Sequence, residues 1–447
     1  MRGGPAVADL VRGDQVHRDL YLSAEVFALE RTRLFRRAWL FVGHDSQIPL
    51  AGDFITCALA GEPVLMLRRE DASVVVLHNR CAHKGAPVVS APAGRIARVL
   101  RCPYHGWTYA TDGGLLGMPL REGYEGTAFA ESEAARGLTH WGEVAVHRGF
   151  VFARAESDGQ DFCQSTGELI EALDLIADRS PVGRLRLAGG VLRTEIQANW
   201  KIYLENVNDS VHPVTTHASA TLSARAVWGN PTEGLEAPLA MRQLLPFGSG
   251  YTFFEKMGGR VLPGGHSVLG THQSLHTSYS ALGDYGQSLR KAHGEERAKR
   301  VLAFSPQNVV FYPTMALKGA PQVMRVLRPL AYNRTIIEAW AFQPEGAPEA
   351  LLESALLYNR QVFSPLSLVA HDDLHLFEHI QTNLAAGPNP WVSLHRQESG
   401  ADGAPPRDVG GVDEALLRNQ YAAWVQLMSD RGPAAPGRGP AAPGRGP

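Results

Sequence analysis

Two histidines and an acidic residue lie close together near the middle of the chain. Asp209, His212 and His217 end a segment, 200–217, whose first part carries apolar side chains at spacings of three and four. This spacing predicts a helix through residue 211 with one buried face, from which Asp209 and His212 project together. Pro213 cannot continue the helical hydrogen bonding, so the chain should turn there and bring His217 back from another direction.

Two neutral histidines and one carboxylate form the facial triad that binds non-haem Fe(II) and leaves positions open for oxygen and substrate. His212 and His217 supply two of these three ligands. Two histidines at this spacing are more often ordinary hydrogen-bonded or surface residues. The iron hypothesis therefore depends on evidence from the rest of the chain.

A second set of metal-binding residue types lies upstream. Cys81-x-His83 and Cys102-x-x-His105 each place one thiol and one imidazole in a predicted hairpin loop. Two thiolates on one iron and two imidazoles on the other hold a Rieske [2Fe-2S] cluster. A structural zinc site uses the same ligand types, but it more often shows Cys-x-x-Cys with two closely spaced histidines. The spacing therefore favours iron–sulfur.

Elements of two kinds must position these residues. Residues 52–152 contain short β-prone runs, such as 64–67, 74–77 and 107–109, which predict a small all-β unit around the Cys/His pairs. Residues 240–343 contain further runs, 251–254, 309–312 and 335–337, and predict an antiparallel sheet packed by helices.

Amphipathic helices are predicted near both ends of the chain, over residues 24–39 and 412–430. In the first, Phe27 and Leu34 are expected on one face, and Glu30 and Arg33 on another. Both helices are expected to serve packing.

Composition narrows the functional classes. A chain of 447 residues has room for two or three domains, and a formal net charge of −2 gives no sign of a nucleic-acid or anionic-membrane partner. No signal peptide or membrane-spanning run is visible, so a cytoplasmic protein is expected. Four cysteines are too few for a disulfide framework in a chain of this size.

Taken together, the two constellations resemble the aromatic-ring-hydroxylating dioxygenases, large (α) subunit, within the Rieske non-haem iron oxygenases. The Cys/His pairs look like the Rieske motif of that family, and the Asn-Trp-Lys, Glu-Asn and Asp-x-x-His-x-x-x-x-His pattern of residues 199–217 resembles its iron site. The resemblance covers roughly residues 20–430 and implies an α+β chain with an N-terminal all-β Rieske domain and a C-terminal helix-grip catalytic domain. The expected divisions are 1–40, a helical segment; 41–155, the Rieske domain; 156–430, the catalytic domain; and 431–447, a disordered Gly/Pro/Ala/Arg tail.

The resemblance also suggests the third iron ligand. The family takes it from a carboxylate that is followed, five residues later, by a Glu and then by a Gln, a pattern that Asp373 fits with Glu378 and Gln381. Asp372 is the second choice. The same segment, 375–379, matches the His-x-x-Glu-His signature of inverted zinc proteases. That class needs another acidic ligand well downstream, where this chain has mainly a low-complexity end.

Two more residues receive roles from their position in this pattern. Asp209 is expected to accept hydrogen bonds from His212 and from a Rieske histidine, His105, and so to connect the two metals. Asn206 is expected beside the mononuclear iron. In the family this connection crosses between neighbouring subunits, so the resemblance implies a homotrimer or an α3β3 assembly with small β subunits.

The implied reaction is hydroxylation of a small aromatic compound by O2, with cis-dihydroxylation as the expected outcome and an aromatic carboxylate as one possible substrate. The chain has no Gly-x-Gly-x-x-Gly nucleotide fingerprint, so electrons from NAD(P)H must arrive through a separate reductase or ferredoxin. The alternatives are a Rieske monooxygenase or O-demethylase, a Rieske electron carrier, and a zinc-stabilised binding module.

Overall fold

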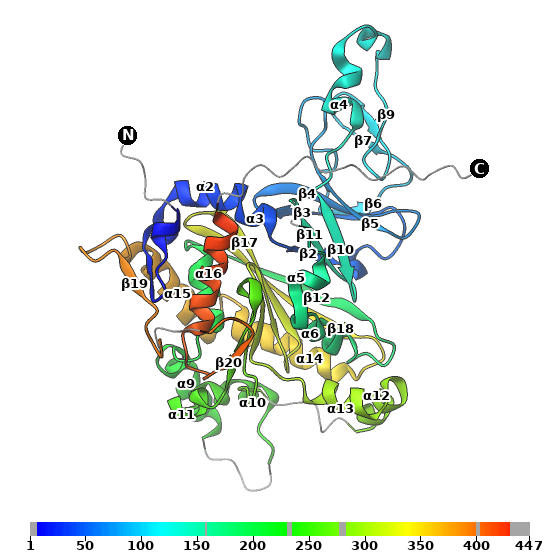
Figure 1. The fold of residues 1–447 in the computed structure, drawn as a ribbon. Coiled ribbons are helices and arrows are strands. Elements are labelled where there is room, and N and C mark those ends of the chain that lie inside the picture. Colours follow the sequence, from blue (N-terminus) through cyan, green and yellow to red (C-terminus); the bar gives the residue numbers. More distant parts are fainter. Residues whose placement is uncertain (1–6, 157–158, 230–234, 277–282, 399–402, 430–447) are drawn as a thin grey trace.

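The structure is a computed structural model that describes residues 7–156, 159–229, 235–276, 283–398 and 403–429. Figure 1 shows two parts: a lobe of small sheets at the top, and below it a large sheet surrounded by helices. The expected low-complexity tail, 431–447, lies outside the described residues.

The lobe contains three small antiparallel sheets. Their strand orders are β10-β11-β2, β5-β4-β3-β6 and β7-β8-β9. The strands are β2 (Leu40–His44), β3 (Asp53–Leu59), β4 (Glu62–Arg68), β5 (Val74–His78), β6 (Ala93–Arg95), β7 (Leu100–Arg101), β8 (Thr108–Tyr109), β9 (Leu115–Gly117), β10 (Glu143–His147) and β11 (Phe150–Arg154). The predicted all-β unit is therefore present, and the β-prone runs fall on β4, β5 and β8.

An antiparallel eight-stranded sheet forms the centre of the second part, in the order β12-β18-β17-β16-β15-β14-β13-β20. Its strands are β12 (Leu185–Ile196), β13 (Gly259–Val261), β14 (Ser267–Leu269), β15 (Asn308–Phe311), β16 (Met315–Lys318), β17 (Val323–Ala331), β18 (Arg334–Pro344) and β20 (Arg407–Val409). A separate pair, β1 (Gln15–His17) and β19 (Trp391–Ser393), joins the two ends of the chain.

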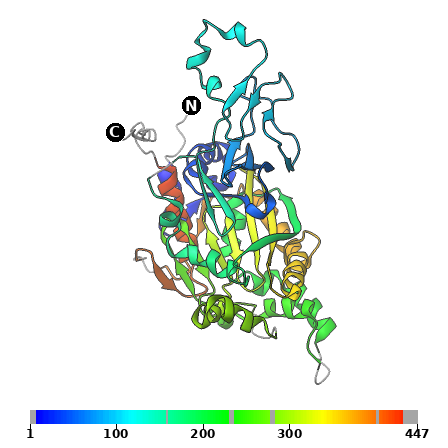
Figure 2. The same ribbon diagram turned by 90° about the vertical axis from the view of Figure 1, so that its right-hand side faces the viewer.

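The helices complete the α+β architecture predicted from the sequence (Figures 1 and 2). They are α1 (Asp19–Leu22), α2 (Ala24–Thr32), α3 (Leu34–Arg37), α4 (Glu133–Arg136), α5 (Phe162–Thr166), α6 (Ile170–Ala177), α7 (Trp200–Asn208), α8 (Pro213–Thr216), α9 (Ala218–Trp228), α10 (Leu239–Leu244), α11 (Tyr251–Glu255), α12 (Tyr285–His293), α13 (Glu295–Ala303), α14 (Glu349–Tyr358), α15 (Leu368–Asn383) and α16 (Ala415–Met428).

The two faces of the large sheet bury different cores. Val309 and Leu317, which pair across β15 and β16, pack with Leu173 of α6 and Phe150 of the lobe. Side chains alternate between the faces of a strand. Val323 of β17 lies on the opposite face, where α9, α11, α14 and α15 pack over the sheet. This helix-covered face is the one that matters for the site.

Two local predictions were wrong. Residues 24–37 form two helices, α2 and α3, instead of one, and Glu30, expected on the face opposite the apolar one, is fully buried. Residues 251–254, expected to be a strand, belong to helix α11, because burial of Phe254 in the helix-covered core outweighs the β propensity of the aromatic run.

No helix in the described part of the chain is both long enough and apolar enough to cross a membrane.

Candidate functional site

Helix α7 and the turn after it carry four of the expected site residues. Its first turn is capped by Asn199, whose side chain accepts a hydrogen bond from the Lys201 N–H at 3.0 Å. The predicted apolar face is confirmed, since Trp200, Tyr203, Leu204 and Val207 are all buried. The helix ends at Asn208, earlier than predicted, and Asp209 is extended. Pro213 then opens α8 in the first-turn position that proline tolerates.

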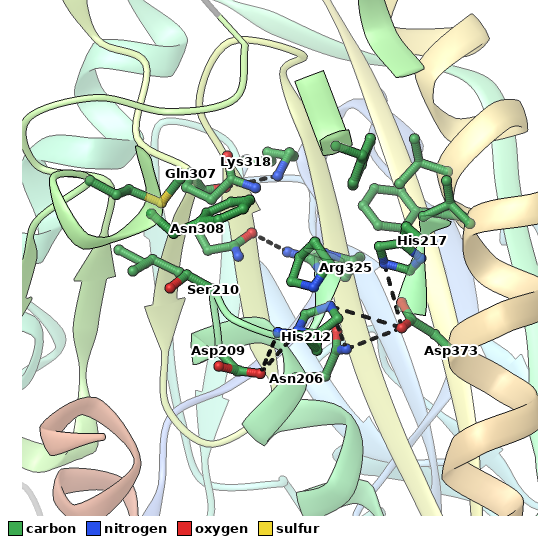
Figure 3. A pocket seen from close by; sticks show the side chains of 18 of the residues that line it. Asn206, Asp209, Ser210, His212, His217, Gln307, Asn308, Lys318, Arg325 and Asp373 are labelled. Atoms are coloured by element: carbon green, nitrogen blue, oxygen red, sulfur yellow. Dashed lines mark hydrogen bonds and ion pairs between the residues drawn. The ribbon is translucent and has the colours of Figure 1, made fainter. Parts of the chain in front are cut away.

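This turn brings both histidines to one place, opposite an acidic residue of α15. The potential metal-binding atoms of His212, His217 and Asp373 all lie within 4.8 Å of one another. Asp373 Oδ1 is 3.6 Å from His217 Nε2 and 3.9 Å from His212 Nε2. Figure 3 shows the two histidines, which flank α8, converging with Asp373 of α15.

The two neighbouring carboxylates of α15 have different surroundings. Asp372 accepts a hydrogen bond from the Ser219 hydroxyl at 2.7 Å and lies 3.8 Å from the other ring nitrogen of His217, Nδ1. Asp373, in contrast, lies near Nε2 of both histidines. The geometry thus favours the first sequence choice, Asp373, over Asp372.

Asn206 and Asp209 contact His212 from two sides. Nδ1 of His212 lies 3.1 Å from Asp209 Oδ2, and Nε2 lies 3.0 Å from the amide nitrogen of Asn206. That amide nitrogen also donates to Asp373 Oδ1 at 3.3 Å. A carboxylate at Nδ1 holds the proton there and leaves the Nε2 lone pair unprotonated, so that a metal can bind it in place of the Asn206 amide. Arg396 donates to the other oxygen of Asp209 at 3.2 Å.

The electrostatics of these groups suit a divalent cation. Burial lowers the pKa of His217 to about 3, which keeps the imidazole neutral, and its buried Nδ1 has no hydrogen-bond partner among the described residues. Burial also raises the pKa of Asp373 to about 6. Burial opposes ionisation of Asp209 as well, but hydrogen bonding and charge from His212 lower its pKa to about 2. Two imidazoles, which bind a metal in their neutral form, and a buried carboxyl group are a donor set that a bound Fe(II) fits.

The four expected cluster ligands lie close together in pairs within the lobe. Cys81 and Cys102 are buried, unbridged thiols, and the rings of His83 and His105 lie with centroids 4.6 Å apart. The Tyr109 hydroxyl lies 3.0 Å from Cys81 Sγ. Burial would raise the pKa of Cys81, but hydrogen bonds from Tyr109 and from the backbone lower it overall. His83 stacks on Trp107, and its buried Nδ1 has no hydrogen-bond partner among the described residues. Paired thiols and paired imidazoles with an unsatisfied nitrogen fit a Rieske cluster.

A narrow cavity of about 50 Å³ opens beside the three converging side chains. Phe247, Tyr358, Val362 and Phe363 line it. The sequence argument missed its polar wall, formed by Gln307, Asn308, Lys318 and Arg325. The available signal was the presence of basic residues in two otherwise apolar strands: Lys318 at the end of β16, and Arg325 and Arg328 in β17.

Comparison with known proteins is consistent with this geometry. Residues 38–127 match the Rieske [2Fe-2S] domain, and residues 183–429 match the ring hydroxylating alpha subunit (catalytic domain). The biphenyl dioxygenase subunit alpha of Paraburkholderia xenovorans is 28% identical over 441 residues, which cover 92% of this chain and 90% of that protein. The anthranilate 1,2-dioxygenase large subunit of Acinetobacter baylyi is 26% identical, with coverages of 93% and 90%.

Among solved structures, naphthalene 1,2-dioxygenase from Rhodococcus sp. bound to indole has a TM-score of 0.72 at 22% identity, covering 93% of this chain and 94% of that one. This likeness supports the fold. The two matched domains imply a Rieske cluster and a mononuclear iron that uses O2. Since the catalytic-domain match alone spans more than half of the sequence, the chain belongs to the ring-hydroxylating α-subunit family of Rieske oxygenases.

Proposed function

We propose that this chain is the terminal oxygenase component that adds both atoms of O2 to an aromatic ring, giving a cis-dihydrodiol. The observation that carries the proposal is the convergence of His212, His217 and Asp373 at the wall of a cavity lined by aromatic side chains. Relatives named for biphenyl and anthranilate dioxygenation support an aromatic substrate.

In this proposal His212, His217 and Asp373 hold the mononuclear iron. When bound there, Fe(II) supplies open coordination positions for oxygen activation. Asp209 fixes the orientation and tautomer of His212 through Nδ1, while the Asn206 amide positions the Asp373 carboxylate. The apolar cavity walls hold the aromatic ring and keep bulk water away from the reacting atoms.

Cys81, His83, Cys102 and His105 are the proposed ligands of the Rieske cluster, which supplies electrons one at a time. They lie in the lobe that Figures 1 and 2 show projecting away from the large sheet. Within the described chain, no hydrogen bond or ion pair joins this tip to Asp209. His105 is exposed at the tip, and its neighbour Tyr104 is 66% exposed. These features support docking of the tip onto another molecule.

A matching depression lies outside α7, lined by Asp209, Glu205, Thr216 and Arg396, and it reaches His212. We place the lobe of a neighbouring subunit in it, with that subunit's exposed Rieske histidine toward Asp209. Head-to-tail contacts of this kind form a ring when the rotation between neighbouring subunits closes, and the expected homotrimer or α3β3 assembly requires such closure. Electrons would come from NAD(P)H through a separate reductase or ferredoxin.

The first test is the metal content and the fate of the oxygen atoms. Anaerobically purified protein should contain about three irons and two acid-labile sulfides per chain and give a Rieske EPR signal when reduced. With a surrogate reductase and ¹⁸O2, a dihydrodiol should carry two labelled atoms from one molecule of O2. One labelled atom, or loss of a methyl group, would assign a monooxygenase or demethylase instead. Two irons without turnover after Fe(II) addition would leave an electron carrier.

A further inference from the structure

Two basic side chains lie buried in the wall of the cavity. Lys318 and Arg325 are only 4% and 5% exposed, and among the described residues neither forms an ion pair. Lys318 Nζ donates to the backbone oxygen of Gln307 at 3.2 Å, and one terminal nitrogen of Arg325 donates to the Asn308 side chain. The Nε atom of Arg325 is buried and has no hydrogen-bond partner in the part of the chain that the structure describes.

The register of the sheet explains why both side chains reach the same cavity. Lys318 at the end of β16 pairs with Val323, and Arg325 follows two residues later on β17. Directly paired residues and residues two apart share a face, so Lys318 and Arg325 are diagonal neighbours. Both therefore project from the helix-covered face, beside Asn308 and Leu269, and into the space shown in Figure 3.

Burying two like charges together is costly unless an anion accompanies them. Burial and the charge of Arg325 together lower the pKa of Lys318 well below its ordinary value, as expected for a pair without an acid. The carboxylates nearest the cavity are already engaged. Asp209 pairs with His212 and Arg396, and Asp373 faces the two histidines of the iron site. The Arg325 guanidinium thus remains without a carboxylate ion pair among the described residues, and an anion bound beside it would also favour the charged form of Lys318.

The rest of the wall suits a flat apolar group. Arg325 lies over the ring of Phe363, 4.8 Å from its centroid, and Lys318 lies 5.8 Å from the centroid of Tyr358. Phe247 and Val362 extend this surface. Such a cavity offers apolar contact for an aromatic ring and charged donors for an anionic substituent.

We propose that the substrate is an aromatic carboxylate, and that Lys318 and Arg325 bind its carboxylate group while the ring lies toward His212, His217 and Asp373. This inference rests on the proposed oxygenase function and narrows its substrate class. Lys318 and Arg325 are specificity residues here, because they position the substrate and take no part in oxygen chemistry.

The experiment measures binding rather than turnover. Anaerobic calorimetry on the holoenzyme compares benzoate and 2-naphthoate with their neutral isosteres, benzamide and 2-naphthamide. Charge-assisted hydrogen bonds should make at least one acid bind roughly 10–100-fold more tightly than its amide. Lys318→Met and Arg325→Met should each remove most of that preference while leaving amide binding little changed. Lys256→Met, at an exposed lysine at the end of α11, should keep the full preference.

Iron and sulfide content and the Rieske spectrum show whether each variant is folded and loaded. The acid-to-amide ratio of the parent protein tests the proposal even if a variant fails to fold. Equal binding of acid and amide, no measurable binding of either acid, or a preference that survives in both Met variants would overturn it. Turnover measurements distinguish failure of the aromatic-carboxylate inference from failure of the proposed oxygenase function. A protein that dihydroxylates neutral arenes but shows no acid preference refutes this inference alone, whereas acid binding without any oxygenation refutes the proposed function.

Discussion

Adjacent residues of α15 point in different directions, because an α-helix rotates by about 100° per residue. Asp373 faces the ring nitrogens of His212 and His217, whereas Asp372 accepts a hydrogen bond from Ser219. The pair provides a matched comparison, since the same substitution can be made at two neighbouring carboxylates.

Asp373→Asn should lose the mononuclear iron, because an amide is a weaker ligand than a carboxylate for this cation. Iron analysis should fall from about three to about two per chain, with sulfide and the Rieske spectrum unchanged. Asp372→Asn is the control and should retain about three. Equal iron loss in both variants would argue against Asp373 as the ligand.

Asp209→Asn should separate metal binding from electron transfer. The amide can no longer hold the His212 Nδ1 proton as a carboxylate does, so product formation should fall roughly 10–100-fold. Both metals should remain at parent levels. Single-turnover oxidation of the reduced cluster, followed by its visible absorbance, measures the step directly, and a parent-like rate would remove Asp209 from the electron path.

Three helices far apart in the sequence meet at one buried carboxylate. Glu30 of α2 accepts hydrogen bonds from Lys201 Nζ at 2.6 Å, from the Trp200 indole at 2.9 Å and from the Trp424 indole at 2.7 Å. These partners lie on α7 and α16. The contact therefore ties both chain ends to the helix that carries the iron site, and it gives the Asn-Trp-Lys motif a structural role.

Glu30→Gln should lower the free energy of unfolding by roughly 3–5 kcal/mol, because it leaves the Lys201 ammonium buried without a counter-charge. Urea denaturation measures this loss. The double variant Glu30→Gln/Lys201→Met removes both charges and should recover much of it. If the double variant is as unstable as the sum of the two single ones, the ion pair is not the source of the effect.

At the scale of the whole molecule, the sheet β10-β11-β2 packs against the catalytic sheet, and the part of the lobe with β7, β9 and α4 projects away from it, as both ribbon views show (Figures 1 and 2). Each chain thus presents its cluster-binding tip and its depression beside Asp209 on different surfaces. This arrangement suits electron transfer between chains.

Mixing two inactive chains tests this arrangement. Cys102→Ala disables the cluster but spares the iron site, and Asp373→Asn does the reverse. If electrons cross between subunits, co-refolded or co-expressed mixtures should regain roughly a quarter of the parent activity, the share of sites with an intact donor beside an intact acceptor. Transfer within one chain predicts no recovery, and each variant alone is the control.

Stability should fall in mild acid. Burial lowers the pKa of His44 and His266 to about 4 and that of His276 to about 3, against 6.5 for an exposed imidazole. The unfolded chain binds more protons between those values, so this stability is fully present above pH 6.5 and is lost as the pH falls toward 4. Glu205 acts oppositely: burial raises its pKa to about 7, so its contribution is full below 4.5 and is lost as the pH rises through 7.

Near pH 5.5 the three histidines outweigh Glu205. The net free energy of unfolding should therefore fall by roughly 2–3 kcal/mol for each unit by which the pH is lowered. Urea denaturation at several pH values measures the slope. His276→Gln should lower the slope by about 1 kcal/mol per pH unit. His293→Gln provides a comparison, because His293 Nε2 lies 2.9 Å from the backbone oxygen of Ser180. An unchanged slope in His276→Gln would contradict the assignment.

Local sequence patterns were sufficient to predict features that depend on residues close together in the chain. The Cys/His pairs predicted the cluster from spacing alone, and the apolar period of 200–207 predicted the buried face of α7. The α+β class followed from β-prone runs and flanking helices. Prediction failed at Glu30 and at 251–254, because burial against distant elements outweighed local polarity and propensity.

By itself, therefore, the sequence determined the ligand types, the family resemblance and the fold class, since these depend on neighbours a few residues apart. Only the tertiary structure decided which carboxylate of α15 faces the histidines, because that choice depends on how α15 rotates against α7 and α9. It also decided that Lys318 and Arg325 share the cavity. Strand register decides which residues of different strands share a face of the sheet. The sequence of one strand alone does not determine the neighbours of its side chains on the adjacent strand.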